Sequence, residues 1–338
     1  MSGERQFLKL HPNSIFLSKN HKLKLQSLLQ SKGILGSKEM LKTLSKAGDG
    51  NMNCVIRAVT TNRSIIIKQS RPWVEKYPHI AAPIGRINVE AKFIKITNHD
   101  PILSAHSPLL LGHFPHHYML IMSDLGDNSD YSHLYSGKSI STFEIATLCN
   151  YLNNLHGITI QSYPDNYAMR HLNHEHIFDL PFKPDNGLSL DEIQSGLSSL
   201  AESVISDEKL VNKIKALGAY YLYSKHSVLI HGDFYPGSFM KTEFGLKVID
   251  AEFSFIGPAE FDWGVLLAHL FMSKQQENIL KYFIAQIEKN KLINSDLVFS
   301  FGGVEILRRI LGVAQLPLSA TLDNKNDWVE NAKKWLLF

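Results

Sequence analysis

The chain has 338 residues, of which 44% are hydrophobic and 20% are charged, and its formal net charge at pH 7 is +3. This composition is ordinary for a globular protein that buries a proper core. Lysines and glutamates are interspersed along the chain, and the lack of a clustered basic stripe argues against a nucleic-acid partner.

The distribution of apolar residues argues against a membrane partner. The longest apolar run in the C-terminal half, residues 264–272, is interrupted by His269 and is far too short to span a bilayer. The first 20 residues lack the apolar core of a signal peptide. The two cysteines, Cys54 and Cys149, lie in apolar stretches, and we expect buried thiols in a reducing compartment. The expected localisation is therefore cytoplasmic.

The N-terminal part of the chain is predicted to be rich in strands. Leucines at helix-like intervals indicate helical or mixed structure over 22–31 and 38–45, and a helix is predicted over 84–97. A hairpin turn at 61–63 joins the first two strands. The predicted strands lie at 53–60, 64–69, 108–112 and 117–122.

The rest of the chain is predicted to be mostly helical, beginning with a helix that ends at His156 and Gly157. The later helices are predicted at 189–205, 208–224, 262–273, 276–290, 296–313 and 326–336. Two short strands at 228–230 and 246–249 interrupt them, and if these pair, the acids that follow them come together in one cleft. This order predicts an α+β protein of two lobes, with a β-rich N-lobe over 1–123 and a helical C-lobe over 124–338.

The segment 160–187 contains three prolines and the histidines His171, His174 and His176. Histidines can bind a metal, but no thiolate or carboxylate here completes a recognisable zinc spacing. We therefore expect a solvated loop.

The strongest chemical signal lies in residues 228–264. Three apolar residues lead into His231-Gly232-Asp233, and a second short strand leads into Asp250 and Glu252. Phosphoryl transfer needs one carboxylate at the acceptor hydroxyl and others to hold Mg²⁺. Asp233 suits the first role, as catalytic base. Asp250 and Glu252 suit the second, because residues i and i+2 of a regular strand share a face. The alternative is that these acids are turn residues or caps.

The N-terminal half supplies the expected partners. Lys68 follows three isoleucines, and a lysine buried in a strand is costly unless its ammonium group finds an anion. Glu90, in the predicted helix, is the natural partner. The alternative for Lys68 is an edge-strand side chain that faces solvent. Upstream, the turn that contains Gly48, Gly50, Asn51 and Asn53 offers backbone amides for phosphates.

Asp262 begins a predicted helix, and two roles are open for it. It is either a plain N-cap or a brace that holds the catalytic loop through backbone amides. We favour the brace.

These motifs resemble the aminoglycoside phosphotransferase and choline kinase superfamily, which has a protein-kinase-like fold. Within it the chain is most similar to the S-methyl-5-thioribose kinase family. The similarity lies in five segments: G-D-G-N-M-N at 48–53, I-K-Q at 67–69, H-G-D-x-x-x-G-S at 231–238, D-x-E at 250–252 and E-x-x-R-R-x-x-G at 305–312.

The resemblance implies that the N-lobe contains a five-stranded antiparallel sheet and binds ATP. It implies a hinge near Met122, Ser123 and Asp124 that holds the adenine, and contacts of Arg308 and Arg309 with a sugar substrate. From the residues alone, solvated surface arginines are the simpler expectation, because adjacent residues of a helix point about 100° apart. A homodimer is also implied as a possible assembly.

The reaction implied is phosphorylation of the 1-hydroxyl of S-methyl-5-thioribose in methionine salvage, with ATP and Mg²⁺. The loop at 77–83 lacks the family's tryptophan, and residues 234–236 also depart from its pattern. A related kinase that acts on another sugar, an aminoglycoside or an amino alcohol is therefore the alternative. A non-catalytic pseudokinase is a third hypothesis, which the retention of Lys68 and the three acids disfavours.

Overall fold

The computed structural model describes residues 3–48, 50 and 52–337, which form two compact units. The N-terminal unit ends at Asn128 and the C-terminal unit begins at Ser129, whereas the sequence-based boundary lies after residue 123. The difference arises because Arg57 holds residues 124–127, which come after the predicted boundary, on the sheet of the N-terminal unit. Its guanidinium contacts the carboxylates of Asp124 and Asp127 and the carbonyl of Gly126.

A five-stranded antiparallel sheet forms the centre of the N-terminal unit. In sheet order its strands are β1 (Leu41–Lys46), β2 (Cys54–Thr60), β3 (Ser64–Gln69), β7 (Met119–Ser123) and β6 (Leu110–Phe114). The expected fold class is confirmed. The helical expectation for 38–45 is wrong, since β1 is an edge strand that exposes most of its side chains and so shows little apolar periodicity.

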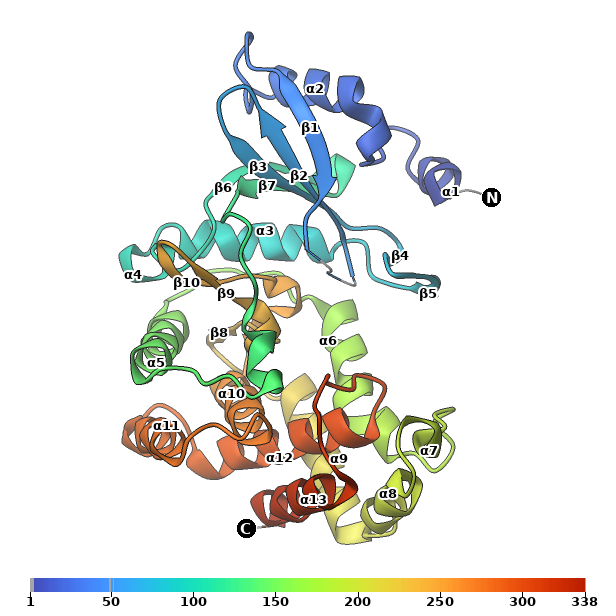
Figure 1. Cartoon of the computed structure of the whole chain (residues 1–338), viewed down its shortest axis with the longest axis vertical. Coiled ribbons are helices and arrows are strands. Elements are labelled where there is room, and N and C mark those ends of the chain that lie inside the picture. The colour runs from blue at the N-terminus through green and yellow to red at the C-terminus, as the bar shows by residue number, and fades with distance from the viewer. Residues whose placement is uncertain (1–2, 49, 51, 338) are drawn as a thin grey trace. The chain divides into compact units, whose positions relative to one another are not determined.

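Helices cover both faces of this sheet (Figure 1). Side chains of β7 alternate between the two faces, as expected for a strand. Met119 and Ile121 belong to the core that includes leucines of α2 (Lys22–Ser31), whereas Leu120 packs with Ile87 and Ala91 of α3 (Arg86–Thr97). The remaining helices of the unit are α1 (Gly3–Leu10), η1 (Lys19–His21), α4 (Pro101–Ser104) and η2 (Pro115–His117).

The predicted loop at 77–83 contains a strand. β5 (Tyr77–Ala81) pairs with β4 (Trp73–Val74), and every residue of β5 is exposed.

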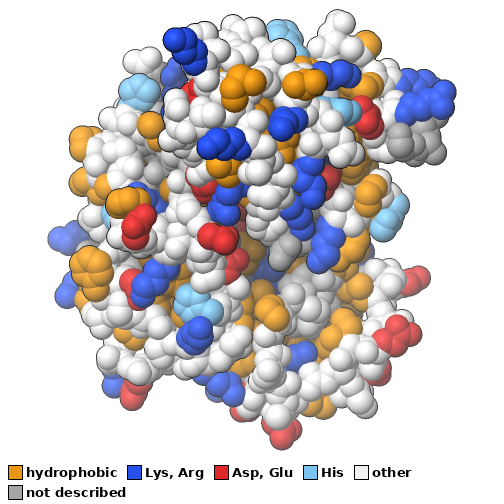
Figure 2. All heavy atoms as spheres, turned by 45° about the horizontal axis from the view of Figure 1, so that its top comes forward, with side chains coloured by type: hydrophobic (Ala, Val, Ile, Leu, Met, Phe, Trp, Pro, Cys, Tyr) orange, Lys and Arg blue, Asp and Glu red, His pale blue; other side chains and the backbone are white. Residues whose placement is uncertain are grey.

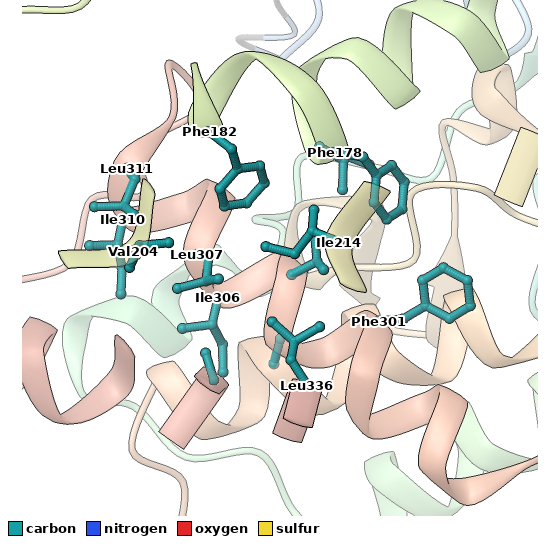
Figure 3. Packing of buried hydrophobic residues seen from close by; sticks show 14 of the residues in the cluster. Phe178, Phe182, Val204, Ile214, Phe301, Ile306, Leu307, Ile310, Leu311 and Leu336 are labelled. Atoms are coloured by element: carbon teal, nitrogen blue, oxygen red, sulfur yellow. The ribbon is translucent and has the colours of Figure 1, made fainter. Parts of the chain in front are cut away.

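The C-terminal unit is mainly helical, and its core lies around α12 (Ser295–Leu311). Phe301, Ile306 and Leu307 of this helix pack with residues of α8 (Leu197–Ile205), α9 (Glu208–Tyr223) and α13 (Leu322–Leu337) (Figure 3). The other helical elements are η3 (Tyr131–Ser136), α5 (Thr142–Gly157), α6 (Tyr167–His174), η4 (Glu175–Asp179), η5 (Leu180–Phe182), α7 (Leu190–Ile193), η6 (Pro236–Ser238), η7 (Ala251–Phe253), α10 (Ala259–Met272) and α11 (Glu277–Lys289).

Two expectations for helices of this unit are wrong. The segment 160–187 is not a solvated loop: α6, η4 and η5 run through it and bury Ile177 and Phe178 in the core. The predicted helix 189–205 is broken into α7 and α8, because Gly196 adopts a left-handed conformation (φ +86°) between them.

The strands at 228–230 and 246–249 do not pair with each other. β8 (Val228–Ile230) pairs with β11 (Phe255–Gly257), and β10 (Gly245–Val248) pairs with β9 (Phe239–Thr242). Both pairings are antiparallel, but only β9 and β10 form a hairpin, whereas β8 and β11 are far apart in the sequence. The short length of these strands hides their character in the sequence.

Glycine allows α10 and α12 to approach closely. A Cβ on Gly264 would lie 2.6 Å from the carbonyl oxygen of Val298 and 2.8 Å from the amide nitrogen of Gly302. This close approach brings side chains of α10 within reach of those on α12.

Both cysteines are free thiols, and burial raises the pKa of Cys54 to about 11 and that of Cys149 to about 12. No helix in the described part of the chain is long and apolar enough to cross a membrane. On the face that Figure 2 displays, basic, acidic and hydrophobic side chains are intermixed.

Candidate active site

In the N-terminal unit, Lys68 on β3 and Glu90 on α3 form a buried ion pair. The Nζ atom of Lys68 lies 2.9 Å from Oε1 and 2.8 Å from Oε2 of Glu90, and each side chain is 2% exposed. The pairing predicted from the sequence is confirmed, and the solvent-facing alternative for Lys68 is wrong. An ammonium group buried this deeply is stabilised by its carboxylate partner.

The glycine-rich turn is anchored at its C-terminal end by Arg86. This buried side chain donates from Nε to Asn53 Oδ1 at 3.0 Å and from Nη2 to the carbonyl of Met52 at 2.7 Å. Gly48 adopts a left-handed conformation at the other end of the turn. Of the residues assigned here from the sequence, Asn51 lies outside the described residues, as does Asp49. Since Arg86 starts the helix that carries Glu90, it links the turn to the ion pair.

The predicted hinge leaves β7 at its C-terminal end. Met122 pairs with Ile66 in the sheet, and the hydroxyl of Ser123 accepts a hydrogen bond from the amide of Leu109. The carboxylate of Asp124 is bound by Arg57, with Nε 2.7 Å from Oδ2. The side chains of Ser123 and Asp124 are thus engaged within the unit.

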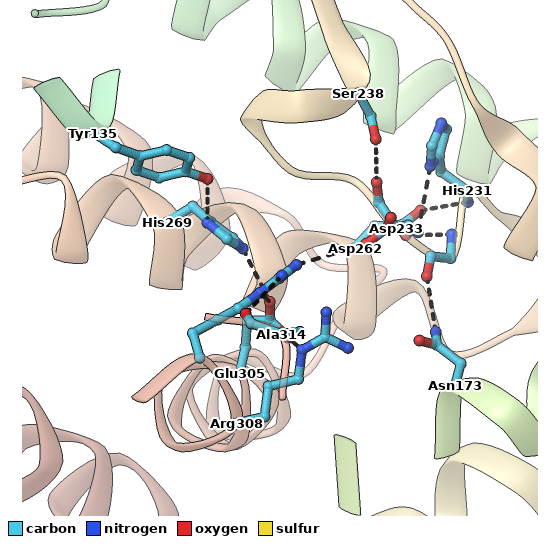
Figure 4. A network of polar contacts seen from close by, with 12 residues as sticks. Tyr135, Asn173, His231, Asp233, Ser238, Asp262, His269, Glu305, Arg308 and Ala314 are labelled. Atoms are coloured by element: carbon cyan, nitrogen blue, oxygen red, sulfur yellow. Dashed lines mark hydrogen bonds and ion pairs between the residues drawn. The ribbon is translucent and has the colours of Figure 1, made fainter. Parts of the chain in front are cut away.

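In the C-terminal unit, β8 leads into His231-Gly232-Asp233, and Asp262 braces this loop. The amides of His231 and Gly232 donate to the two carboxylate oxygens of Asp262 at 2.8 and 3.0 Å. His156 lies 3.1 Å from the same carboxylate, which is fully buried. The expected bracing role is confirmed, and Figure 4 shows Asp262 bonded to the loop. The plain N-cap is wrong because α10 begins after Pro258.

Three further side chains hold the loop. Asn173 of α6 donates to the carbonyl of Gly232 at 3.1 Å, and the hydroxyl of Ser238 donates to the carbonyl of Asp233 at 2.8 Å. The Nε2 atom of His231 lies 3.0 Å from the carbonyl oxygen of Ile249, so it carries the proton and donates. This last bond joins the loop of Asp233 to the segment that leads into Asp250.

Gly232 is required where it stands. Its φ is +81°, and an added Cβ would lie 2.3 Å from the carbonyl oxygen of Phe253. We expect Gly232→Ala to lower the free energy of unfolding by more than about 2 kcal/mol in urea titrations, because both the backbone strain and the clash oppose the native loop. Gly157→Ala is the matched control, since a Cβ there meets nothing within 4 Å; it should stay within about 0.5 kcal/mol of wild type. Equal stabilities of the two variants would contradict the assigned constraint.

The expected strand geometry for Asp250 and Glu252 is wrong. β10 ends at Val248, Asp250 adopts a left-handed conformation (φ +64°), and Glu252 lies in the turn η7. The physical reason is the anchoring of this turn from α6 and the residues before it. Asn166 donates to the carbonyls of Glu252 and Ser254 at 2.9 and 3.0 Å. A non-glycine residue held in this conformation is typical of a functional site.

The Asp233 carboxyl lies beside two buried arginines. Burial raises its pKa to about 6, against the lowering effect of Arg309 and Arg308, while Glu305 and Glu252 add to the rise. The Oδ1 atom of Asp233 is 4.0 Å from Nη2 of Arg309, and its side chain remains a quarter exposed. A carboxyl group with such a pKa can accept a proton near neutral pH.

Both arginines share one carboxylate, that of Glu305 on the same helix. Nε of Arg309 lies 2.7 Å from Oε1 of Glu305, and Nε of Arg308 lies 3.0 Å from Oε2. The arginines are 6% and 8% exposed, so the expectation of solvated surface arginines is wrong. Burial opposes ionisation of Glu305, but the two guanidinium groups hold its pKa well below the usual range.

Glu305 is held in turn by His269 and Tyr135 (Figure 4). Nε2 of His269 lies 2.9 Å from Oε1 of Glu305, and the Tyr135 hydroxyl lies 2.6 Å from Nδ1. Burial lowers the pKa of His269 to about 4, so the ring is neutral. Because an ionised Glu305 only accepts, Nε2 carries the proton, and Nδ1 accepts from Tyr135.

The sequence-based list of site residues omits the side chains that support this arrangement. His269 could have been identified from the sequence, because it is a histidine inside an otherwise apolar helix. Glu305 is the first residue of the segment E-x-x-R-R-x-x-G, but the sequence alone did not indicate its function. The supporting contacts of Tyr135, Asn166 and Asn173 could not be predicted, because the sequence around these residues shows no pattern that indicates burial.

In the described residues, no group of three histidine, cysteine or acidic side chains is placed to hold a metal ion. Asp250 and Glu252 offer only two carboxylates. This number suits Mg²⁺, which keeps several waters and completes its shell with phosphate oxygens.

Comparisons with known proteins agree with this architecture. Residues 52–292 match the model of the phosphotransferase enzyme family. A methylthioribose kinase from Bacillus cereus is 26% identical over 361 residues, and the match covers 86% of this chain and 84% of that protein. Another from Erwinia tasmaniensis is 27% identical over 250 residues, covering 68% of this chain and 59% of the relative.

Solved structures show the same fold. A spectinomycin phosphotransferase in complex with ADP and spectinomycin has a TM-score of 0.54 at 14% identity, covering 93% of this chain and 97% of that one. Plasmodium vivax ethanolamine kinase has a TM-score of 0.53 at 14% identity, covering 98% and 92%. The fold is therefore the protein-kinase-like fold of small-molecule kinases.

Within that class, the family match spans more than half of the chain. The chain belongs to the phosphotransferase enzyme family.

Proposed function

We propose that the protein transfers the γ-phosphate of ATP to the 1-hydroxyl of S-methyl-5-thioribose, with Asp233 as catalytic base. The observation that carries this proposal is the carboxylate of Asp233 next to two buried arginines that share Glu305. The relatives named methylthioribose kinase support the choice of acceptor.

Asp233 would receive the acceptor hydroxyl and take its proton as the phosphoryl group arrives. Four hydrogen bonds with Asp262, Asn173 and Ser238 fix the backbone around it: Asp262 accepts two of them, and Asn173 and Ser238 donate one each. Little reorganisation is therefore needed in the reaction. Its quarter-exposed side chain leaves room for a hydroxyl group to approach.

Lys68 is the residue that we propose for the ATP phosphates, oriented by Glu90. The turn with Gly48, Gly50, Asn51 and Asn53 would contribute backbone amides. The side chain of Asn53 serves instead as the anchor for Arg86.

The adenine would be held by backbone groups of Met122, Ser123 and Asp124, because Ser123 and Asp124 already use their side chains within the unit. Asp250 and Glu252 are the proposed ligands of Mg²⁺, which when bound would neutralise charge on the phosphates.

The surroundings of Asp233 favour a neutral acceptor over a cationic one. Arg308 and Arg309 place two positive charges beside the carboxylates of Glu305 and Asp233, so these two acids are already neutralised. Choline or an aminoglycoside carries a positive charge, and its recognition calls for acids or aromatic faces. The alternative acceptor is another sugar, because the exposed strand β5 stands where the family has its tryptophan loop.

A coupled assay of ADP release tests the proposal. Purified protein, ATP and Mg²⁺ should turn over methylthioribose at the highest kcat/KM in a panel that also contains ribose, choline, ethanolamine and spectinomycin. Clear turnover of another alcohol with none of methylthioribose would overturn the assigned substrate. Failure to turn over any alcohol would support the pseudokinase hypothesis instead.

The raised pKa of Asp233 predicts an acid limb in the rate profile. The base must be ionised, and its pKa is about 6, so kcat should be nearly constant above pH 7. Below pH 6 it should fall about tenfold per pH unit as the carboxyl group becomes protonated. Steady-state rates between pH 4.5 and 8.5 measure this. A constant kcat down to pH 5 would contradict the role of Asp233 as base.

A further inference from the structure

The guanidinium group of Arg309 is largely used within the protein. Its Nε atom contacts Glu305 at 2.7 Å, and its Nη1 atom donates to the carbonyl of Ala314 at 3.2 Å. The plane lies over the ring of Tyr235, 5.0 Å from its centroid. The remaining nitrogen, Nη2, is 4.0 Å from Oδ1 of Asp233. Every nitrogen of this side chain therefore has a protein group nearby.

Arg308 is placed differently, although it is the next residue on the same helix. Its Nε atom lies 3.0 Å from Glu305, as in its neighbour. Its two terminal nitrogens make no hydrogen bond or ion pair with any residue that the structure describes, and Figure 4 shows them directed away from the Glu305 network. A buried guanidinium group that keeps free donors is suited to a polar ligand.

The difference follows from the helix. Glu305 precedes the arginines by three and four residues, so both reach it, but they do so from different sides of α12. His269 and Tyr135 fix the carboxylate from the direction of α10 and η3. These contacts hold the Glu305 carboxylate in place, so it does not move towards either arginine. The two guanidinium groups therefore point in different directions.

We infer that the two arginines have different roles. Arg308 donates hydrogen bonds to the acceptor, whereas Arg309 is a positioning residue that orients the Asp233 carboxylate without binding the acceptor. This inference rests on the proposed function. Arg308 then determines the affinity for the acceptor, and Arg309 determines the orientation and ionisation of the Asp233 carboxyl group.

The charged groups around Asp233 determine how the loss of each arginine changes the pKa of the Asp233 carboxyl group. The groups that act on it are Arg308, Arg309 and Glu305 of α12, Glu252 of η7, and the phenols of Tyr135 and Tyr235. Of the two arginines, only Arg309 has a nitrogen within 4.0 Å of the carboxylate. Removing its charge should therefore raise the pKa of the base, and less of the base is then ionised at a given pH.

Two single variants, Arg308→Gln and Arg309→Gln, separate the roles when assayed with whichever acceptor the wild-type protein phosphorylates. Arg308→Gln should raise the KM for the acceptor about 10- to 100-fold and leave kcat within about threefold, since a charged hydrogen bond is lost. Arg309→Gln should lower kcat about 10- to 100-fold, keep the acceptor KM within about threefold, and move the acid limb of kcat to higher pH.

Conservative variants guard against a trivial loss of folding. Arg309→Lys retains the charge, so it should return the acid limb towards that of the wild type, with a thermal midpoint close to wild type. If Arg309→Gln does not fold, the acceptor KM of Arg309→Lys decides. A KM within about threefold of the wild-type value supports the positioning role, whereas a rise of about tenfold or more with unchanged kcat would overturn it.

Equal rises in acceptor KM for the two glutamine variants, with kcat unchanged in both, would overturn the division of roles. That result would leave the proposed function standing, because the wild-type protein would still phosphorylate the acceptor. Absence of any acceptor turnover by the wild type would instead overturn the proposed function.

Discussion

Asp233→Ala should lower kcat by about a thousandfold or more, while the affinity for ATP stays close to that of the wild type. The loss is large because the variant removes the proton acceptor and the group that orients the hydroxyl. Affinity for ATP should persist because the buried pair of Lys68 and Glu90 belongs to the other unit and is untouched. Steady-state kinetics and isothermal titration with a non-hydrolysable ATP analogue measure the two quantities.

Asp185→Ala is the control for this substitution. Asp185 is an exposed aspartate of the same unit, and its loss should leave kcat unchanged within about twofold. If Asp233→Ala kept a kcat near that of the control, Asp233 would not be the catalytic base.

Glu305→Ala should lower the free energy of unfolding by about 3–5 kcal/mol. The substitution leaves two buried guanidinium groups without their shared carboxylate and removes the acceptor of the His269 proton. Urea unfolding followed by tryptophan fluorescence measures the change. We also expect the rate of acceptor phosphorylation to fall, because the guanidinium groups of Arg308 and Arg309 are no longer held in place by Glu305.

Glu288→Ala provides the comparison, because Glu288 is an exposed glutamate on α11 of the same unit. Its substitution should change the free energy of unfolding by less than about 0.5 kcal/mol. A loss below about 1 kcal/mol in Glu305→Ala would mean that the arginines find other partners, and the account of the network would be wrong.

The parts of the fold that could be predicted are those with a local pattern. The hairpin of β2 and β3 had apolar runs on both sides of a polar turn, and α3 had one apolar face. The pairing of Lys68 with Glu90 could be predicted because a lysine within an isoleucine-rich strand needs an anion. The predicted helix over 84–97 offered Glu90 as that anion.

The rest depended on contacts between distant segments, which no local pattern encodes. The pairing of β8 with β11, rather than with β10, is set by tertiary packing around short strands. The turn at Asp250 and Glu252 is set by Asn166, which is far away in the sequence. Arg308 and Arg309 could not be distinguished from surface residues, because their burial follows from how α12 packs against α10 and its neighbours.

The activity that we propose for this chain is phosphorylation of the anomeric hydroxyl of a sugar, with Asp233 as base. The most direct test is ³¹P nuclear magnetic resonance of the products formed from ATP and methylthioribose by wild type and by Asp233→Ala. We expect ADP together with a new phosphomonoester signal coupled to the anomeric proton in the wild-type reaction, and no such signal in the reaction of the variant. ADP with inorganic phosphate alone, or a phosphoester on another hydroxyl, would contradict it.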